Sequence, residues 1–162
     1  MNTVFVARDL GPSLDLEKVL NTLRDQGQND IPFNFLRDKL EIFPGTAKPM
    51  IKEVVSLPGN VDVVLCGMSS SAELAQEELA ACEAAVKNGV PLCLFADTFN
   101  AWARPWFEPY RAAASALFVI NTEEAEKAKP LFPNAKIVAS GNPAEDNTAV
   151  KAIVGTLQEL CR

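Results

Sequence analysis

The sequence of 162 residues contains no histidine. Histidine is the usual general base of serine and cysteine hydrolases and a frequent zinc ligand, so its absence excludes Ser-His-Asp and Cys-His catalysis and most zinc sites. The four cysteines, which are Cys66, Cys82, Cys93 and Cys161, form no Cys-x-x-Cys pair. We therefore expect reduced thiols, no metal and no cofactor, as in a cytoplasmic protein.

Positive charge and long apolar runs are also scarce. The formal net charge is -6 and no stretch is basic, so we expect no nucleic-acid partner. No apolar run approaches the roughly 20 residues that span a bilayer. Residues 1–8 have neither a basic leader nor a cleavage site, which predicts no signal peptide. The expectation is a cytoplasmic chain without a membrane span.

What the sequence does contain is an alternation of apolar strands with amphipathic helices. The strands are expected at Thr3–Arg8, Ile31–Leu36, Val61–Cys66, Val90–Ala96, Ala116–Ile120 and Lys136–Ser140. The helices are expected from Ser13 to about Gly27, over Pro49–Leu57, from Ser70 to Asn88, within the aromatic stretch Asp97–Ala114, over Glu123–Leu131 and over Thr148–Cys161.

Strands that alternate with helices at this spacing pair in parallel through right-handed crossovers. The predicted fold class is therefore α/β, with a doubly wound, mostly parallel, Rossmann-like sheet of about six strands and helices on both faces. It forms a single domain over residues 1–162. The continuous apolar character of the middle strands predicts that Val61–Cys66 and Val90–Ala96 are central, together with the first strand, and that Lys136–Ser140 lies toward one edge.

Ligands of such sheets bind beyond the carboxyl ends of the strands. Gly67, Ser69, Ser70 and Ser71 form a small-residue turn there, before a helix. Free N–H groups at a helix start suit an anion, and an ordinary capped helix is the alternative, because Ser70 and Glu73 match the S-x-x-E capping box. The turn matches neither G-x-G-x-x-G nor a Walker A loop, so no dinucleotide or P-loop site is predicted.

Further candidate ligand-binding residues follow the later strands. They are Asp97, Asn100, Trp102, Arg104, Asn121 and Asn142. Asp97 could accept a hydrogen bond from a ligand hydroxyl and Arg104 could bind an anion; alternatively, Asp97 caps the next helix and Arg104 pairs internally. The neighbouring aromatic residues are either core, an oligomer face or a platform for stacking a sugar or base.

Catalytic candidates are few. Asp97 and Glu73 could act as a carboxylate pair, although Glu73 already has the predicted capping role. Cys66 precedes the Gly67 turn, where a helix N-terminus could lower its pKa, but without a histidine a structural thiol is the preferred interpretation.

From Val61 onward the chain resembles the N-terminal domain of GT-B glycosyltransferases and of the related UDP-N-acetylglucosamine 2-epimerases. The matching segments are Val61–Ser71, Gly89-Val90-Pro91, the strand that reaches Asp97, the aromatic–arginine segment to Trp106, the strand Ala116–Ile120, and Gly141-Asn142-Pro143. The turn Arg8–Pro12 departs from the family, because it lacks the Gly-rich acceptor loop with histidine. The epimerases also depend on histidine, and the chain ends one helix after Gly141-Asn142-Pro143, without the second domain that binds the donor.

The resemblance implies a GT-B N-terminal-like domain that binds a small molecule or acceptor, such as a sugar or a nucleotide-sugar-related ligand, at the strand ends. Such a domain is catalytically incomplete alone, as one half of a split transferase would be. Two alternatives stay open. One is a regulatory or assembly module that binds a protein partner or forms a homo-oligomer through its aromatic surface. The other is a small hydrolase that uses Asp97 and Glu73.

Overall fold

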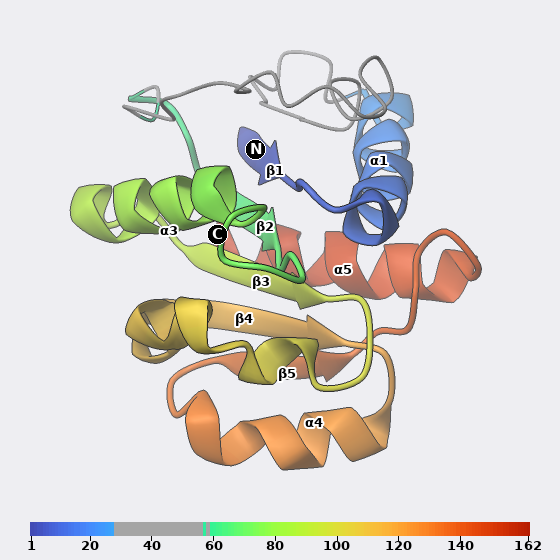
Figure 1. The fold of residues 1–162 in the computed structure, drawn as a ribbon. Coiled ribbons are helices and arrows are strands. Elements are labelled where there is room, and N and C mark those ends of the chain that lie inside the picture. The colour runs from blue at the N-terminus through green and yellow to red at the C-terminus, as the bar shows by residue number, and fades with distance from the viewer. Residues whose placement is uncertain (28–56, 58) are drawn as a thin grey trace, which may run out of the picture.

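The computed structural model describes residues 1–27, 57 and 59–162. In this part of the chain, five strands and the helices between them form an α/β structure (Figure 1). The strands are β1 (Thr3–Val6), β2 (Val63–Gly67), β3 (Leu92–Ala96), β4 (Ala114–Val119) and β5 (Lys136–Ala139). The α-helices are α1 (Leu10–Asp25), α3 (Gln76–Asn88), α4 (Thr122–Ala128) and α5 (Asn147–Leu160). Three 3-10 helices, η1 (Ala101–Ala103), η2 (Pro105–Ala113) and η3 (Lys129–Leu131), complete the described elements.

The described strands form one sheet in the order β1-β2-β3-β4-β5, and every neighbouring pair is parallel. Every residue of β2 and β3 is buried, because helices cover both faces and leave no side for polar residues. These observations confirm the predicted parallel α/β sheet, the central position of its two most apolar strands and the edge position of the Lys136–Ser140 strand.

Alternate residues of each strand face two separate cores, as the period of a strand requires. On one face, α1 and α5 pack on the side of Phe5, Leu65 and Phe95. On the other face, α3, η1, η2 and α4 pack on the side of Val64 and Leu94. The helices of the described chain therefore cover both faces of the sheet (Figure 1).

The first strand, expected to be central, lies at one edge of the five described strands, next to β2. Its residues are nevertheless buried. The apolar character of this strand therefore indicates that it is buried, and it does not indicate where the strand lies in the strand order of the sheet. The expected strand Ile31–Leu36 and the expected helix Pro49–Leu57 lie outside the described residues, apart from Leu57.

Several predicted helix ends are wrong. Helix α1 begins at Leu10, three residues before the expected cap Ser13, whose Oγ instead donates to Ala7 O at 3.3 Å. Helix α3 begins at Gln76 without a side-chain cap, so the Ser70–Glu73 capping box does not form. The segment Asp97–Ala114 contains 3-10 helix, which suits a short stretch that includes Pro105 and Pro109. No described helix is long and apolar enough to cross a bilayer.

Candidate functional site

The loops that follow β1 and β2 are joined by hydrogen bonds. Asp9 N donates to Ser69 Oγ at 3.1 Å, and Ser70 N donates to Asp9 Oδ2 at 2.7 Å. Ser69 N donates to Glu78 Oε2 at 2.9 Å. The backbone N–H groups of Ser69 and Ser70, which the sequence offers to an anion, are therefore bonded to carboxylates of the chain itself.

Glu78 lies beneath these loops and is fully buried. It comes from the first turn of α3, and its Oε1 accepts hydrogen bonds from Arg8 N at 3.0 Å and from Ser69 Oγ at 2.7 Å. Burial raises the pKa of Glu78 to about 8; the hydrogen bonds from Ser69 and Arg8 oppose this effect, and the charge of Asp9 adds to it.

Asp97 follows β3 and is 9% exposed. A Cβ atom on Gly11, in the first turn of α1, would lie 2.5 Å from Asp97 Oδ2, so only glycine permits this approach. Burial raises the pKa of Asp97; the Arg104 guanidinium and the backbone N–H of Asp97 itself oppose the rise, and Asp9 adds to it. The Asp97 side chain thus extends from the β3–η1 loop to the start of α1.

Asn142, in the loop between β5 and α5, approaches the same position. Its Nδ2 donates to Asp97 O at 3.3 Å, while its Oδ1 is buried and has no hydrogen-bond partner among the described residues. The opposite orientation of the amide would place two acceptors against each other, so the Asp97 carbonyl fixes it. A buried amide oxygen without a donor is costly to leave unbonded.

Asp15 of α1 brings a further carboxyl group to this edge. It is 4% exposed, and its Oδ1 accepts a hydrogen bond from Ala144 N at 2.7 Å. Burial raises the pKa of Asp15 to about 6; the bond from Ala144 opposes the rise, and the carboxylates of Asp97 and Glu145 add to it. Asp15 and Asp97 therefore influence each other although they come from different elements.

The aromatic–arginine segment packs on the β2–α3 loop. Arg104 Nη1 donates to Met68 O, and its Nη2 reaches Thr98 Oγ1 at 3.5 Å. Trp106, which is half-buried, donates from Nε1 to Ser69 O at 3.1 Å. These contacts bring two predicted site residues, Ser69 and Arg104, into one group with Trp106.

Trp102 and Asn100 belong to a different group, centred on the buried carboxylate of Glu124 in α4. Glu124 Oε2 accepts hydrogen bonds from Asn100 N at 2.6 Å and from Trp102 Nε1 at 2.8 Å. Burial acts to raise the pKa of Glu124, but these two donors and the Lys127 ammonium outweigh it, so the pKa is lowered. Asn100 has a φ of 58°, a left-handed conformation that asparagine tolerates better than most residues.

Three other candidates lie apart from the Asp97 group. Asn121, a candidate ligand-binding residue, accepts a hydrogen bond at Oδ1 from Glu124 N at 2.9 Å and so caps α4. Glu73 is exposed in the turn before α3, whereas Asp97 is buried, and no hydrogen bond joins the two in the described part of the chain. The neighbouring Cys82 and burial raise the pKa of the Cys66 thiol well above its usual range, which suits a structural residue and not a nucleophile.

The edge formed by these loops offers mainly hydrogen-bond acceptors. Asp9, Asp15 and Asp97 contribute carboxyl oxygens, and Asn142 contributes an amide oxygen without a donor. Hydroxyl and ammonium groups can supply hydrogen bonds to such acceptors, whereas a phosphate would be repelled by the carboxylates. Among the described residues, no three histidine, cysteine or acidic side chains are placed to hold a metal ion.

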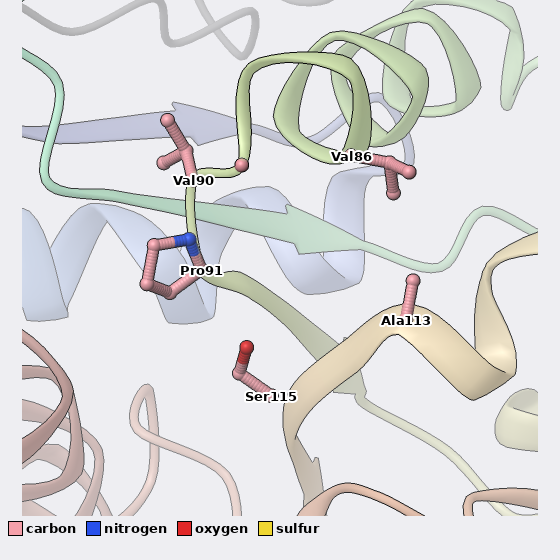
Figure 2. A pocket seen from close by; sticks show the side chains of 6 residues that line it. Val86, Val90, Pro91, Ala113 and Ser115 are labelled. Carbon is pink, nitrogen blue, oxygen red and sulfur yellow. The ribbon is translucent and has the colours of Figure 1, made fainter.

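A shallow pocket lies at the opposite end of the sheet, where β3 and β4 begin (Figure 2). It has a volume of about 290 Å³ and is lined by Val86, Gly89, Val90, Pro91, Ala113 and Ser115. This lining has no charged side chain and only the Ser115 hydroxyl as a polar side-chain group. The pocket therefore offers little that would orient a polar ligand.

The carboxyl groups of Asp15, Glu78 and Glu124 were not predictable from the sequence as part of the site. Each looks like an ordinary acidic residue near the start of a helix, where the helix dipole favours negative charge. Nothing in the local pattern distinguishes a buried carboxyl from a solvated one. Asp9 had a positional signal, because it lies directly after the first predicted strand.

The fold and this edge define a class of protein: a parallel α/β domain whose strand ends carry buried carboxyl groups and an unbonded amide oxygen. Comparisons with protein-family models, with curated protein sequences and with solved structures find no match for this chain.

Proposed function

We propose that this protein is a binding domain for a small hydroxyl-bearing molecule, such as a sugar. The molecule binds at the carboxyl edge of the sheet, which is the edge formed by the loops after the carboxyl ends of the strands. The domain does not complete a glycosyl transfer alone. The observation that carries the proposal is the buried, unbonded Asn142 Oδ1 held beside Asp97. Both groups accept hydrogen bonds, so a ligand hydroxyl is the simplest complement.

The proposal includes the GT-B N-terminal-like arrangement expected from the sequence. In that arrangement the sheet is doubly wound, and the placement of α1 and α3 over opposite faces supports it. The acidic edge favours an acceptor over a nucleotide-sugar donor, because three carboxyl groups oppose the approach of a diphosphate. The absence of histidine supports a binding function without complete catalysis.

The test is a titration of the protein with N-acetylglucosamine as a neutral polyol, with UDP-N-acetylglucosamine as the phosphorylated counterpart, and with inorganic phosphate. Amide shifts in NMR spectra report binding. We expect N-acetylglucosamine to shift the amides of Gly11, Asp97 and Asn142, and phosphate to leave them unchanged. Binding of phosphate and UDP-N-acetylglucosamine without binding of the neutral sugar would contradict the proposal.

Asp97→Asn gives the matching variant. Loss of one charge-assisted hydrogen bond weakens binding by about 1.5–3 kcal/mol, or roughly 10- to 150-fold. Asp25→Asn is the control, because Asp25 is exposed at the C-terminal end of α1, the opposite end of that helix from Gly11, which approaches Asp97. Equal affinities of the two variants would contradict the assigned role of Asp97.

A second candidate function, a module that binds a protein partner, is favoured by one observation. Phe99 is 66% exposed and lies two residues after Asp97, and Leu10 is 55% exposed and directly precedes Gly11. Exposed apolar side chains beside a polar edge are typical of interaction surfaces. Light scattering distinguishes the two functions. A wild-type homo-oligomer that becomes monomeric in Phe99→Ser would support the interaction module. A monomeric wild type would contradict a module that forms homo-oligomers.

A further inference from the structure

Glu78 occupies a position in which its carboxyl group contacts both loops of the candidate site. Its two oxygens accept hydrogen bonds from Arg8 N, Ser69 N and Ser69 Oγ, at 2.7–3.0 Å. Arg8 belongs to the loop after β1, and Ser69 belongs to the loop after β2. One side chain from α3 therefore ties together two loops that are about 60 residues apart in the sequence.

The Glu78 carboxyl group is closely packed against the start of the β1–α1 loop and the end of β2. A Cβ atom on Gly67 would lie 3.0 Å from Pro12 Cβ, 3.2 Å from Glu78 Oε1 and 3.3 Å from Ala7 Cβ. Glu78 itself is 0% exposed. Because the carboxyl group is buried away from water, a change in its protonation must be accommodated by the groups that contact it.

The charged and titratable neighbours come from three elements. In the loop after β1, Asp9 opposes ionisation of Glu78, while Arg8 forms an ion pair with Glu77 of α3 at 3.6 Å. In β2, the Cys66 Sγ donates to Glu78 O at 3.7 Å, and this thiol is also close to Cys82 of α3.

These neighbours leave both protonation states of Glu78 accessible. Burial raises its pKa to about 8, against the three hydrogen-bond donors that favour the carboxylate. The two states therefore interconvert near neutral pH.

Proton uptake changes the hydrogen bonds in a defined way. The Ser69 hydroxyl carries one hydrogen, which it donates to Glu78 Oε1, and it accepts the N–H of Asp9. If the proton binds at Oε1, the Glu78 hydroxyl must donate to Ser69 Oγ, and that bond reverses its direction. The Ser69 hydrogen then needs another acceptor. Ser69 Oγ now accepts from both Glu78 and Asp9 N and no longer donates to a carboxylate, so the bond from Asp9 N is weakened.

We propose that Glu78 is a proton-operated latch: the ionised carboxylate holds the β1–α1 and β2–α3 loops together, and protonation loosens them and displaces Asp9. This inference deepens the proposed function, on which it rests only for its effect on ligand binding. The latch itself is a property of the unliganded protein. It makes the carboxyl edge responsive to pH at the point where Asp9 meets Ser69 and Ser70.

The test follows the backbone amides of Arg8 and Ser69 by NMR, without ligand, from about pH 5 to about pH 10, together with the Cδ signals of the glutamate carboxyls. We expect both amides and one Cδ signal to titrate with a common midpoint near 8. Glu78→Gln should abolish the amide titration. Glu83→Gln is the control, because Glu83 is exposed on the same helix, and this variant should titrate like the wild type.

The outcomes separate the latch from the proposed function. Flat Arg8 and Ser69 amides in the wild type, or a titration that persists in Glu78→Gln, would overturn the latch. If Glu78→Gln does not fold, the wild-type Cδ signals decide, because the latch requires one glutamate carboxyl group to titrate with a midpoint near pH 8. If N-acetylglucosamine binds, its affinity should decrease at pH values below the titration midpoint, by at most about tenfold per pH unit. Titrating amides without any sugar binding would contradict the proposed function and leave the latch intact.

Discussion

Three polar side chains buried in this fold differ in how many hydrogen bonds they form. Glu78 accepts three and Glu124 accepts two from neighbouring backbone and side-chain donors. Thr3, in β1, is 0% exposed, and its Oγ1 has no partner among the described residues. A buried hydroxyl without a hydrogen-bond partner retains the free-energy cost of leaving water, so Thr3 destabilises the fold. The two glutamates, in contrast, connect different elements through their hydrogen bonds.

Thr3→Val tests this interpretation. Valine has the shape of threonine and replaces the hydroxyl with a methyl group, so no cavity forms and the cost of burial is removed. We expect the free energy of unfolding to rise by about 1 kcal/mol. Urea unfolding would show this rise as a higher midpoint with an unchanged slope.

Thr156→Val is the matched control for that measurement. Thr156 is also buried, but its Oγ1 donates to Ala152 O at 2.9 Å within α5. The same substitution there loses a hydrogen bond, so it should not stabilise the protein. A loss of stability in Thr3→Val equal to that in Thr156→Val would show that the Thr3 hydroxyl has a partner.

At the scale of elements, the segment η1–η2 connects two parts of the structure through its tryptophans. Trp102 is 7% exposed and donates to Glu124 of α4, whereas Trp106 is half-buried and donates to Ser69 O in the loop after β2. The first contact fixes the segment to the fold, and the second places it beside the candidate site. The two residues are therefore expected to have different roles.

Alanine substitutions separate these roles. Trp102→Ala should cost about 3–5 kcal/mol, because it removes a buried aromatic ring and leaves the Glu124 carboxylate without one donor. Trp106→Ala should cost less, because part of the ring is already in water, and it should weaken binding of N-acetylglucosamine. Melting curves and NMR titrations of both variants measure these effects. Unfolding of both variants would remove Trp106 from the site and make the whole segment part of the core.

The sequence was sufficient to predict most of the described strands and their parallel pairing. Val63–Gly67 and Leu92–Ala96 are short apolar runs between helices, and such runs become strands when both faces are covered. The cap at Asn121 was also predictable, because an asparagine directly before an acidic first turn is a local signal.

Other features depend on contacts between distant segments, which no local pattern contains. The start of α3 was misplaced because Ser69 and Ser70 donate their N–H groups to Glu78 and Asp9, and so form a turn where a capped helix was expected. The loops of the site were located by the rule for parallel sheets, but its buried carboxyls were not. Their burial depends on which helix each loop meets.

For the whole molecule, the buried carboxyls predict how stability depends on pH. Glu78 and Asp15 have pKa values raised to about 8 and about 6, respectively, so the folded state holds protons that the unfolded state releases near pH 4. A raised carboxyl pKa stabilises the fold at low pH, and that contribution is lost as the pH rises through the folded value. Glu124 acts in the opposite direction, because its lowered pKa contributes stability that is lost only as the pH falls through that value.

We therefore expect the free energy of unfolding to decrease from about pH 5 to about pH 8 and then to level off. Each unit of pKa difference corresponds to about 1.4 kcal/mol, which sets an upper limit of several kcal/mol for Glu78. Urea unfolding at successive pH values measures the curve. Asp15→Asn should reduce the slope of the curve below about pH 6, and Glu78→Gln should reduce its slope up to about pH 8. A wild-type curve that stays flat or rises over this interval would show that both carboxyls are ionised throughout, with the hydrogen bonds from Ser69, Arg8 and Ala144 outweighing burial.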